Sequence, residues 1–238
     1  MPSPIGHALG GALFGGVFAG GRGSIAADPA SRGRWWRDAL VLAGVGLLPD
    51  LDFLLGIHSR YTHSVGAVAM AGVVAWLVMR LAASRRTSQA AHGAARVPRL
   101  RSGRPERPSK GEGAARGDGA PAPRQARGAL SLPKGASDRA GRLRLGWALA
   151  VAAAYGSHLL FDWLGSDTTP PIGIMALWPF SGAFVQSDVH LFMAISRRYW
   201  LANFWSHNLT AVAWELALLG PPTLVVWWWR SRICTTSK

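Results

Sequence analysis

Four apolar stretches, each close to the length that crosses a lipid bilayer as a helix, constrain this chain most strongly. They cover residues 39–57, 65–83, 145–164 and 209–229, and a hydrocarbon core of about 30 Å requires about 20 apolar residues in a helix. A fifth stretch, residues 5–21, is apolar, glycine-rich and shorter. We expect an all-α, polytopic membrane helical bundle of four to five spans, because a helix satisfies its backbone hydrogen bonds within the bilayer.

The composition supports a lipid environment. Charged residues make up 16% of the chain, against about a quarter in ordinary soluble domains, and 12 tryptophans are present. The single cysteine, Cys234, excludes an intramolecular disulfide and a cysteine-based zinc site. Any metal ion must therefore be held by His, Asp or Glu.

A basic segment at residues 84–144 separates two apolar halves, residues 1–83 and 145–238. It has no aromatic residue and no apolar periodicity, so we expect a disordered linker. Residues 80–144 contain 16 Lys or Arg against 4 Asp or Glu, which accounts for most of the net charge of +14. Nucleic-acid binding is not expected, because no aromatic side chains that could stack on bases lie between the arginines.

The basic residues also predict an orientation. They follow the first apolar stretch, fill the linker and follow the last stretch, and such segments remain on the cytoplasmic side. We therefore expect a multi-pass inner-membrane protein whose linker and C-terminus are cytoplasmic. The N-terminus, residues 58–64 and residues 165–207 would then lie on the other side.

A further apolar stretch, residues 172–195, is interrupted by Pro179, Ser181 and Asp188. We expect a re-entrant or interfacial piece here, with residues 188–207 as an interfacial helix. The tryptophans around it fit the aromatic belt that forms at membrane surfaces.

Ionisable side chains in and beside the apolar stretches are the strongest functional signal, because each is costly in a membrane. They fall at or near the expected outer ends of four helices: His7, Asp50, Asp52, His63, His158 and Asp162. His158 and Asp162 are four residues apart, so both lie on one helix face and can bind one cation. Such a pair alone is more often a hydrogen-bonding pair, and an isolated aspartate after Pro49 could be an N-cap. The convergence of six residues favours a metal site.

Three carboxylates and three imidazoles at one end of a bundle predict a mono- or dinuclear site for a divalent metal. The histidines favour zinc, and the carboxylates leave manganese or magnesium possible. Pro49 can break the helix and let Asp50 and Asp52 turn inward, and the choice of primary ligand between them stays open.

The motifs that carry these residues resemble those of a known family. They are LPDLD at 48–52, RYTHS at 60–64, HLLFD at 158–162 and LWPFS at 177–181, with His7 in a glycine-rich N-terminal segment. Together they resemble the YdjM-type family of membrane-bound, metal-dependent hydrolases, over nearly all of the chain except the linker. The order of His and Asp is also similar, more remotely, to that of zinc-dependent phospholipase C and the P1-type nucleases.

The resemblance implies a hydrolase whose metal ligands are Asp50 or Asp52, His63, His158 and Asp162, and it supplies no substrate. The family commonly has an arginine directly after the first histidine of the loop. Here Ser59 stands between His58 and Arg60.

Hydrolysis of a phosphoester or lipid-like substrate at the non-cytoplasmic membrane face is the predicted activity. A metal ion in such a site acidifies bound water and polarises a phosphoryl or acyl oxygen. Whichever of Asp50 and Asp52 is not a ligand could act as general base or bind a second metal. Arg60 could neutralise a phosphate oxygen or anchor a lipid headgroup, and His58 could be catalytic or interfacial.

Two other classes of function remain open. Carboxylates and histidines in a membrane also serve cation or proton carriers and channels, although no internal repeat supports transport here. A non-catalytic membrane protein with a structural metal would use the same residues, because closed and open coordination shells share ligand types.

Overall fold

Five α-helices and one 3-10 helix make up the regular structure of the described part of the chain. The computed structural model describes residues 1–19, 35–55, 60–95, 134–167 and 170–236. Its elements, in chain order, are α1 (Pro4–Phe18), α2 (Trp35–Leu47), the 3-10 helix η2 (Leu48–Leu55), α3 (Val65–Ala95), α4 (Lys134–Trp163) and α5 (Phe204–Thr236). Outside these helices the described residues form loops with isolated β-bridges. The predicted all-α class is confirmed.

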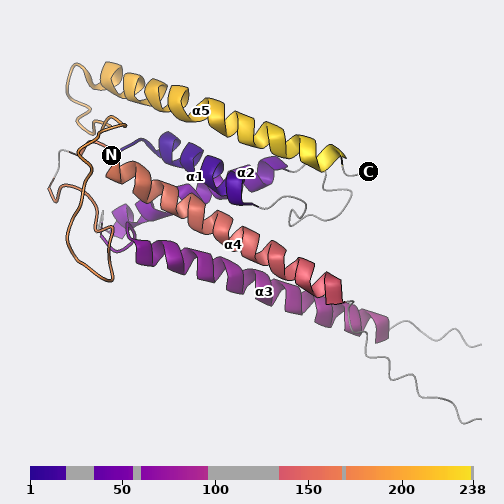
Figure 1. Cartoon of the computed structure of the whole chain (residues 1–238). Helices are drawn as coiled ribbons and strands as arrows, with labels where there is room; N and C mark the ends of the chain where they lie inside the picture. Colours follow the sequence, from indigo (N-terminus) through magenta and orange to yellow (C-terminus); the bar gives the residue numbers. More distant parts are fainter. Residues whose placement is uncertain (20–34, 56–59, 96–133, 168–169, 237–238) are drawn as a thin grey trace, which may run out of the picture.

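The short apolar helix α1 lies at the centre of the bundle (Figure 1). It packs against α2, α4 and α5, whereas α3 packs against α4 on the outside. The start of α1, the end of α4 and the beginnings of α3 and α5 all lie at one end of the bundle (Figure 1). Segments far apart in the sequence therefore meet at this end.

Two glycines bring α1 and α2 into backbone contact. A Cβ atom on Gly11 would lie 2.4 Å from the carbonyl oxygen of Leu42. One on Gly46 would lie 2.5 Å from the carbonyl oxygen of His7. Any larger residue at this crossing would separate the two helices, so glycine is required at both positions.

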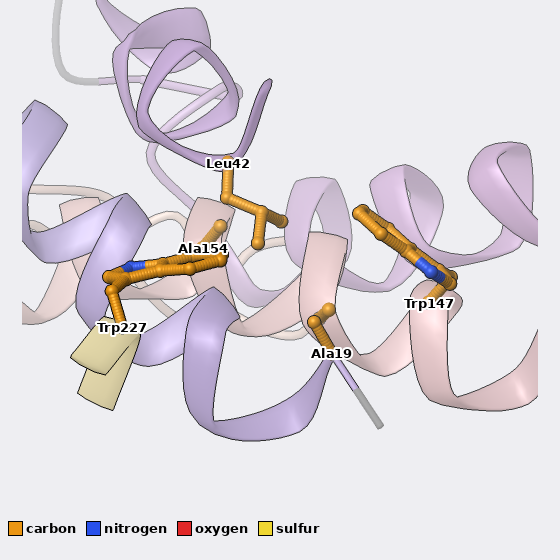
Figure 2. Close-up of a cluster of buried hydrophobic side chains, with 6 residues drawn as sticks. Ala19, Leu42, Trp147, Ala154 and Trp227 are labelled. Carbon is orange, nitrogen blue, oxygen red and sulfur yellow. The ribbon is translucent and has the colours of Figure 1, made fainter. Parts of the chain in front are cut away.

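A cluster of small and large apolar side chains packs beside this crossing, and Figure 2 shows its members. Its buried members are Ala19, Leu42, Trp147, Ala150, Ala154 and Trp227. Leu42 of α2 is fully buried. The small alanine side chains of α4 let α1 and α2 approach α4 closely. Small residues at helix contacts are typical of bundles in lipid, where close packing takes the place of the hydrophobic effect.

Apolar side chains are exposed along two helices, whereas most of the predicted ligands are buried in the interior. Two helices in the described chain are long and apolar enough to cross a membrane, α3 over Val65–Arg85 and α5 over Phe204–Arg232. The apolar window of α3 has 0% of its residues buried, and that of α5 has 22%. Five of the six predicted ligands, all except Asp50, are instead buried. This distribution fits a lipid solvent, because lipid tails solvate apolar groups and exclude charges.

The predicted count of four to five spans is not confirmed, because two helices of the described residues have the length and composition of a span. The stretch at 39–57 is not one helix, because α2 ends at Leu47 and Pro49 lies in the 3-10 helix that follows. Helix α1 has 15 residues, a length of about 22 Å at 1.5 Å per residue. That length is shorter than a hydrocarbon core of about 30 Å.

Two predicted segment boundaries also differ from the structure. Helix α3 continues to Ala95 and α4 begins at Lys134, so helix covers both ends of the segment expected as linker, and residues 96–133 lie outside the described residues. The interfacial helix predicted at 188–207 is wrong, because regular helix begins only at Phe204. Hydrogen bonds to neighbouring elements replace it, for example from the backbone N–H of Leu191 to the carbonyl of Leu164 at 2.8 Å.

We predict that Gly46→Ala destabilises the protein whereas Gly44→Ala on the same helix does not. The added methyl group at Gly46 would overlap the α1 backbone, and a Cβ at Gly44 meets nothing within 4 Å. Overpacking of this kind typically lowers the free energy of unfolding by about 1–3 kcal/mol. Thermal unfolding of both detergent-purified variants, followed by circular dichroism, tests this. Equal melting temperatures would contradict the backbone contact.

Candidate metal centre

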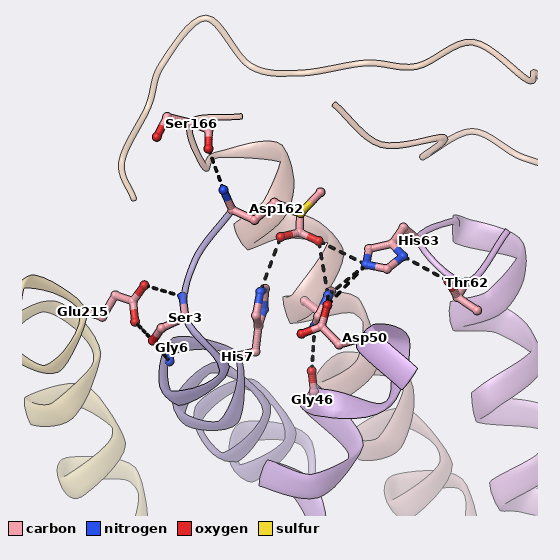
Figure 3. A network of polar contacts seen from close by, with 12 residues as sticks. Ser3, Gly6, His7, Gly46, Asp50, Thr62, His63, Asp162, Ser166 and Glu215 are labelled. Carbon is pink, nitrogen blue, oxygen red and sulfur yellow. Dashed lines mark hydrogen bonds and ion pairs between the residues drawn. The ribbon is translucent and has the colours of Figure 1, made fainter. Parts of the chain in front are cut away.

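Three histidines and three aspartates meet at the end of the bundle where α1 begins and α4 ends. Figure 3 labels His7, His63, Asp50 and Asp162 of this group. His7 comes from the first turns of α1, and Asp50 and Asp52 come from η2. His63 lies in the loop before α3, and His158 and Asp162 lie in the last turns of α4. The structure thus brings together all six residues that were predicted as metal ligands.

Two carboxylate oxygens lie close to the Nε2 atoms of His63 and His158. The Nε2 atoms of His63 and His158 lie 3.1 Å apart. Asp162 Oδ2 is 3.3 Å from the first of these nitrogens and 3.2 Å from the second. Asp50 Oδ1 is 3.9 Å from the first and 3.4 Å from the second.

The contacts of the two Nδ1 atoms determine whether each Nε2 atom has a lone pair available for a metal ion. The Nδ1 atom of His158 lies 2.8 Å from the carbonyl oxygen of Gly46, which can only accept a hydrogen bond. The Nδ1 atom of His63 lies 3.3 Å from Asp52 Oδ2. Each Nδ1 therefore carries the proton in a neutral imidazole, and each Nε2 presents a lone pair. Two lone pairs and two carboxylate oxygens face one another, an arrangement that calls for a cation between them.

The geometry fits a divalent metal ion. In a tetrahedral site with metal–ligand bonds of about 2.0–2.1 Å, the ligand atoms lie about 3.3 Å apart. Four of the five separations given above are between 3.1 and 3.4 Å. Both carboxylate oxygens of Asp162 are buried and have no hydrogen-bond partner among the described residues. A buried carboxylate without donors is satisfied by a cation.

His7 extends the cluster on the α1 side. Its ring stacks on that of His158, with the ring centroids 3.6 Å apart. Its Nε2 atom lies 3.4 Å from Asp162 Oδ1, and its buried Nδ1 has no hydrogen-bond partner among the described residues. His7, His158 and Asp162 thus form one group that could hold a metal ion, and Asp50, His63 and His158 form another that shares His158 with it. The structure is compatible with one ion or two.

Asp52 lies behind His63 rather than beside its Nε2 atom. It contacts the Nδ1 side of the His63 ring and accepts a hydrogen bond from the hydroxyl of Thr62. The carbonyl of Thr62 in turn accepts a hydrogen bond from Tyr155 at 2.9 Å. An aspartate behind a metal-binding histidine orients the ring and raises its basicity. This position suits Asp52 for orienting His63 more than for binding the metal.

The electrostatic field of the carboxylates acts strongly on His63. Burial lowers the pKa of His63, but the carboxylates of Asp162, Asp50 and Asp52 outweigh burial and raise this pKa to about 11. Positive charge is therefore strongly stabilised at this point of the structure. Without a metal ion, a proton on the imidazole supplies it.

Asp50 marks the open side of the cluster. Its side chain is 33% exposed, whereas those of His63, Asp162 and Asp52 are 0–4% exposed. Arg60 is exposed, and its carbonyl accepts the backbone N–H of His63 at 3.0 Å. His58, the other predicted catalytic residue, lies outside the described residues.

Glu215 is a buried acidic residue that sequence reasoning missed. It lies in α5 with 0% exposure and accepts hydrogen bonds from Ser3, at the start of α1 (Figure 3). It is the one acidic residue in the apolar stretch 209–229. A carboxylate in such a stretch is a sufficient signal to single it out.

We predict that Asp52→Asn weakens metal binding without abolishing it. Loss of a residue that orients a metal-binding histidine typically lowers metal affinity by about 10–100-fold, and Asp50→Asn should lower it further because a ligand atom is replaced. Zinc affinity can be measured by competition with a chromophoric chelator. Asp188→Asn is the matched control, because Asp188 is exposed. A greater loss for Asp52→Asn than for Asp50→Asn would reverse the two assignments.

Comparison with known proteins agrees with the motifs. A family model described as YdjM inner membrane protein matches residues 1–233. This match confirms the resemblance drawn from the motifs, and the inner-membrane description agrees with the exposed apolar faces of α3 and α5. No curated protein and no solved structure matches the chain. The remote similarity to zinc-dependent phospholipase C and P1-type nucleases stays a prediction.

Proposed function

Because the chain belongs to the YdjM inner membrane protein family, we propose that it is a membrane-embedded, metal-dependent hydrolase acting on a phosphoester or lipid-like substrate. The observation that carries the proposal is the close approach of carboxylate oxygens of Asp162 and Asp50 to the paired Nε2 atoms of His63 and His158. Zinc is favoured, because imidazole nitrogens make up half of this set, with manganese or magnesium as alternatives.

The proposed roles follow from where each side chain lies. A divalent ion held here would act as a Lewis acid towards a phosphoryl or acyl oxygen and would acidify bound water. The two buried histidines and Asp162 would hold it. Asp50 is partly exposed, so it can also take up a proton from a water molecule on the open side. Asp52 and the carbonyl of Gly46 keep the two imidazoles in the tautomer that binds metal.

Apolar side chains near the open side support a lipid-like substrate. Leu48 and Leu51, which flank Asp50 in η2, are about half exposed, as is Tyr61 beside the His63 loop. Exposed leucine and tyrosine at a polar opening suit a molecule with both a charged headgroup and an apolar chain. The exposed guanidinium of Arg60 is available for the negative charge of such a headgroup.

We place this site on the non-cytoplasmic side of the inner membrane. The basic residues after α1 and in the segment between α3 and α4 favour the cytoplasm for the opposite end of the bundle. In a Cys234→Ser background, we expect Val189→Cys, at an exposed position, to react with an impermeant thiol reagent in intact cells. Lys110→Cys should react only after lysis. The reverse labelling pattern would show that the orientation is inverted.

We predict that His158→Ala and Asp162→Ala each abolish both bound metal and hydrolysis while the protein stays in the membrane. Each change removes one of these ligand atoms. The measurements are metal content by mass spectrometry and turnover of phosphodiester, phosphomonoester and phospholipid substrates, with and without a chelator. His190→Ala is the matched control, because His190 is exposed.

The possible outcomes separate the proposed function from its alternatives. Loss of metal and turnover together in the two variants supports the hydrolase. Metal that is bound by the native protein without turnover of any substrate class would indicate a structural metal. Metal-dependent flux of cations into vesicles, again without hydrolysis, would indicate a carrier. Unchanged metal content in both variants would show that these residues do not form the metal site.

A further inference from the structure

Helix α5 carries two charged residues that contact opposite ends of the central helix α1. Glu215 reaches the first residues of α1, and Arg230 reaches its last turn. These two residues are 15 positions apart, which equals the 15 residues of α1. Both lengths are about 22 Å at 1.5 Å per residue. The spacing of the two charges thus matches the length of the helix that they contact.

At the N-terminal end, Glu215 binds the capping residue of α1. The backbone N–H of Ser3 donates to Glu215 Oε1 at 2.7 Å, and the hydroxyl of Ser3 donates to Glu215 Oε2. The same hydroxyl oxygen accepts the N–H of Gly6 at 3.1 Å, which is the N-cap bond of the helix. A Cβ on Gly6 would lie 2.7 Å from the carboxylate, so glycine leaves the room that Glu215 occupies.

At the C-terminal end, Arg230 binds carbonyl groups that the helix itself leaves unpaired. Its Nη1 atom donates to the carbonyl of Gly16 at 3.0 Å, and Nη2 donates to that of Ala19 at 2.7 Å. The guanidinium also lies over the ring of Trp227. The indole N–H of Trp227 donates to the carbonyl of Ala12 at 3.1 Å.

The signs of the two charges match the helix dipole. The N-terminus of a helix has unpaired N–H groups and partial positive charge, and the C-terminus has unpaired carbonyls and partial negative charge. A helix too short to reach the membrane surfaces at both ends cannot rely on water for these groups. The carboxylate of Glu215 and the guanidinium of Arg230 supply the missing partners in the matching order.

This arrangement bears directly on the metal centre through His7. The backbone N–H of His7 donates to the carbonyl of Ser3 at 3.1 Å, so the residue held by Glu215 also sets the position of His7. We propose that Glu215 and Arg230 are positioning residues that fix α1 along α5 and so hold the His7 imidazole against His158 and Asp162. The proposal rests on the metal site described under the proposed function.

The first test measures zinc affinity in the full-length, detergent-purified protein. We expect Glu215→Ala to lower the affinity by about 10–100-fold, the usual effect of losing a residue that supports a ligand. Glu215→Gln, which keeps an oxygen acceptor for Ser3, should lose less. Thr223→Ala is the matched control, because Thr223 is buried on α5 and its hydroxyl donates to the carbonyl of Leu219 in the same helix. Native affinity in Glu215→Ala, or an equal loss in Thr223→Ala, would overturn the proposal.

A double-mutant cycle separates positioning from general destabilisation. In a His7→Ala background, Glu215→Ala should cause little further loss of zinc affinity, because the residue through which it acts is already absent. If Glu215→Ala lowered zinc affinity by the same factor with and without His7, Glu215 would act on the stability of the fold alone. That result would overturn the positioning role and leave the metal site standing.

A measurement without metal tests the positions of the helices directly. It applies even if the native protein binds no metal, a result that would contradict the proposed function. Spin labels at Val17→Cys on α1 and Leu224→Cys on α5, both exposed positions, report the distance between the helices in a Cys234→Ser background. We expect one narrow distance distribution, broadened or shifted by Glu215→Ala and by Arg230→Met, and unchanged by Thr223→Ala. An unchanged distribution in the first two variants would overturn the inference.

Discussion

Three aspartates lie largely or wholly removed from water at one end of a helical bundle. The rest of the structure depends on how their negative charges are compensated. Their charge must be compensated locally, because neither lipid nor a packed interior solvates a carboxylate. The imidazoles of His63 and His158 lie among them with both Nε2 atoms turned inward. The carbonyl of Gly46 and the carboxylate of Asp52 hold those rings in place from behind. The cluster is therefore built to accept positive charge at its centre.

Helix α1 brings this cluster together although it contributes only one of the six side chains. Its glycine contact with α2 brings Gly46 close to His7 and allows the Gly46 carbonyl to reach His158. Its ends are bound by side chains of α5. A short helix in the middle of a membrane bundle needs such partners, because water does not reach its terminal N–H and carbonyl groups. The packing of α1 therefore also determines the geometry of the site.

Several features of the fold and site could be predicted from local patterns in the sequence. Length and apolar character are local properties, and they identified the helices around 65–83, 145–164 and 209–229. The four-residue spacing of His158 and Asp162 places both on one helix face in any fold. The prediction of an interfacial helix at 188–207 is wrong because of tertiary contacts. The backbone of this segment forms hydrogen bonds with neighbouring elements, for example between Ser196 and the side chain of Asn208.

The sequence by itself determined the all-α class, the apolar exterior and the six candidate ligands, because periodicity, composition and residue chemistry act over a few residues. Only the tertiary structure decided that Asp50 faces the converging nitrogens while Asp52 lies behind His63. The two aspartates are two positions apart in a 3-10 helix of about three residues per turn, so they point in different directions. The pairing of Glu215 with Ser3 joins residues 212 positions apart, and no local pattern encodes a contact over that distance. Such contacts depend on how the helices pack, which is why their partners could not be assigned before the helices were placed in space.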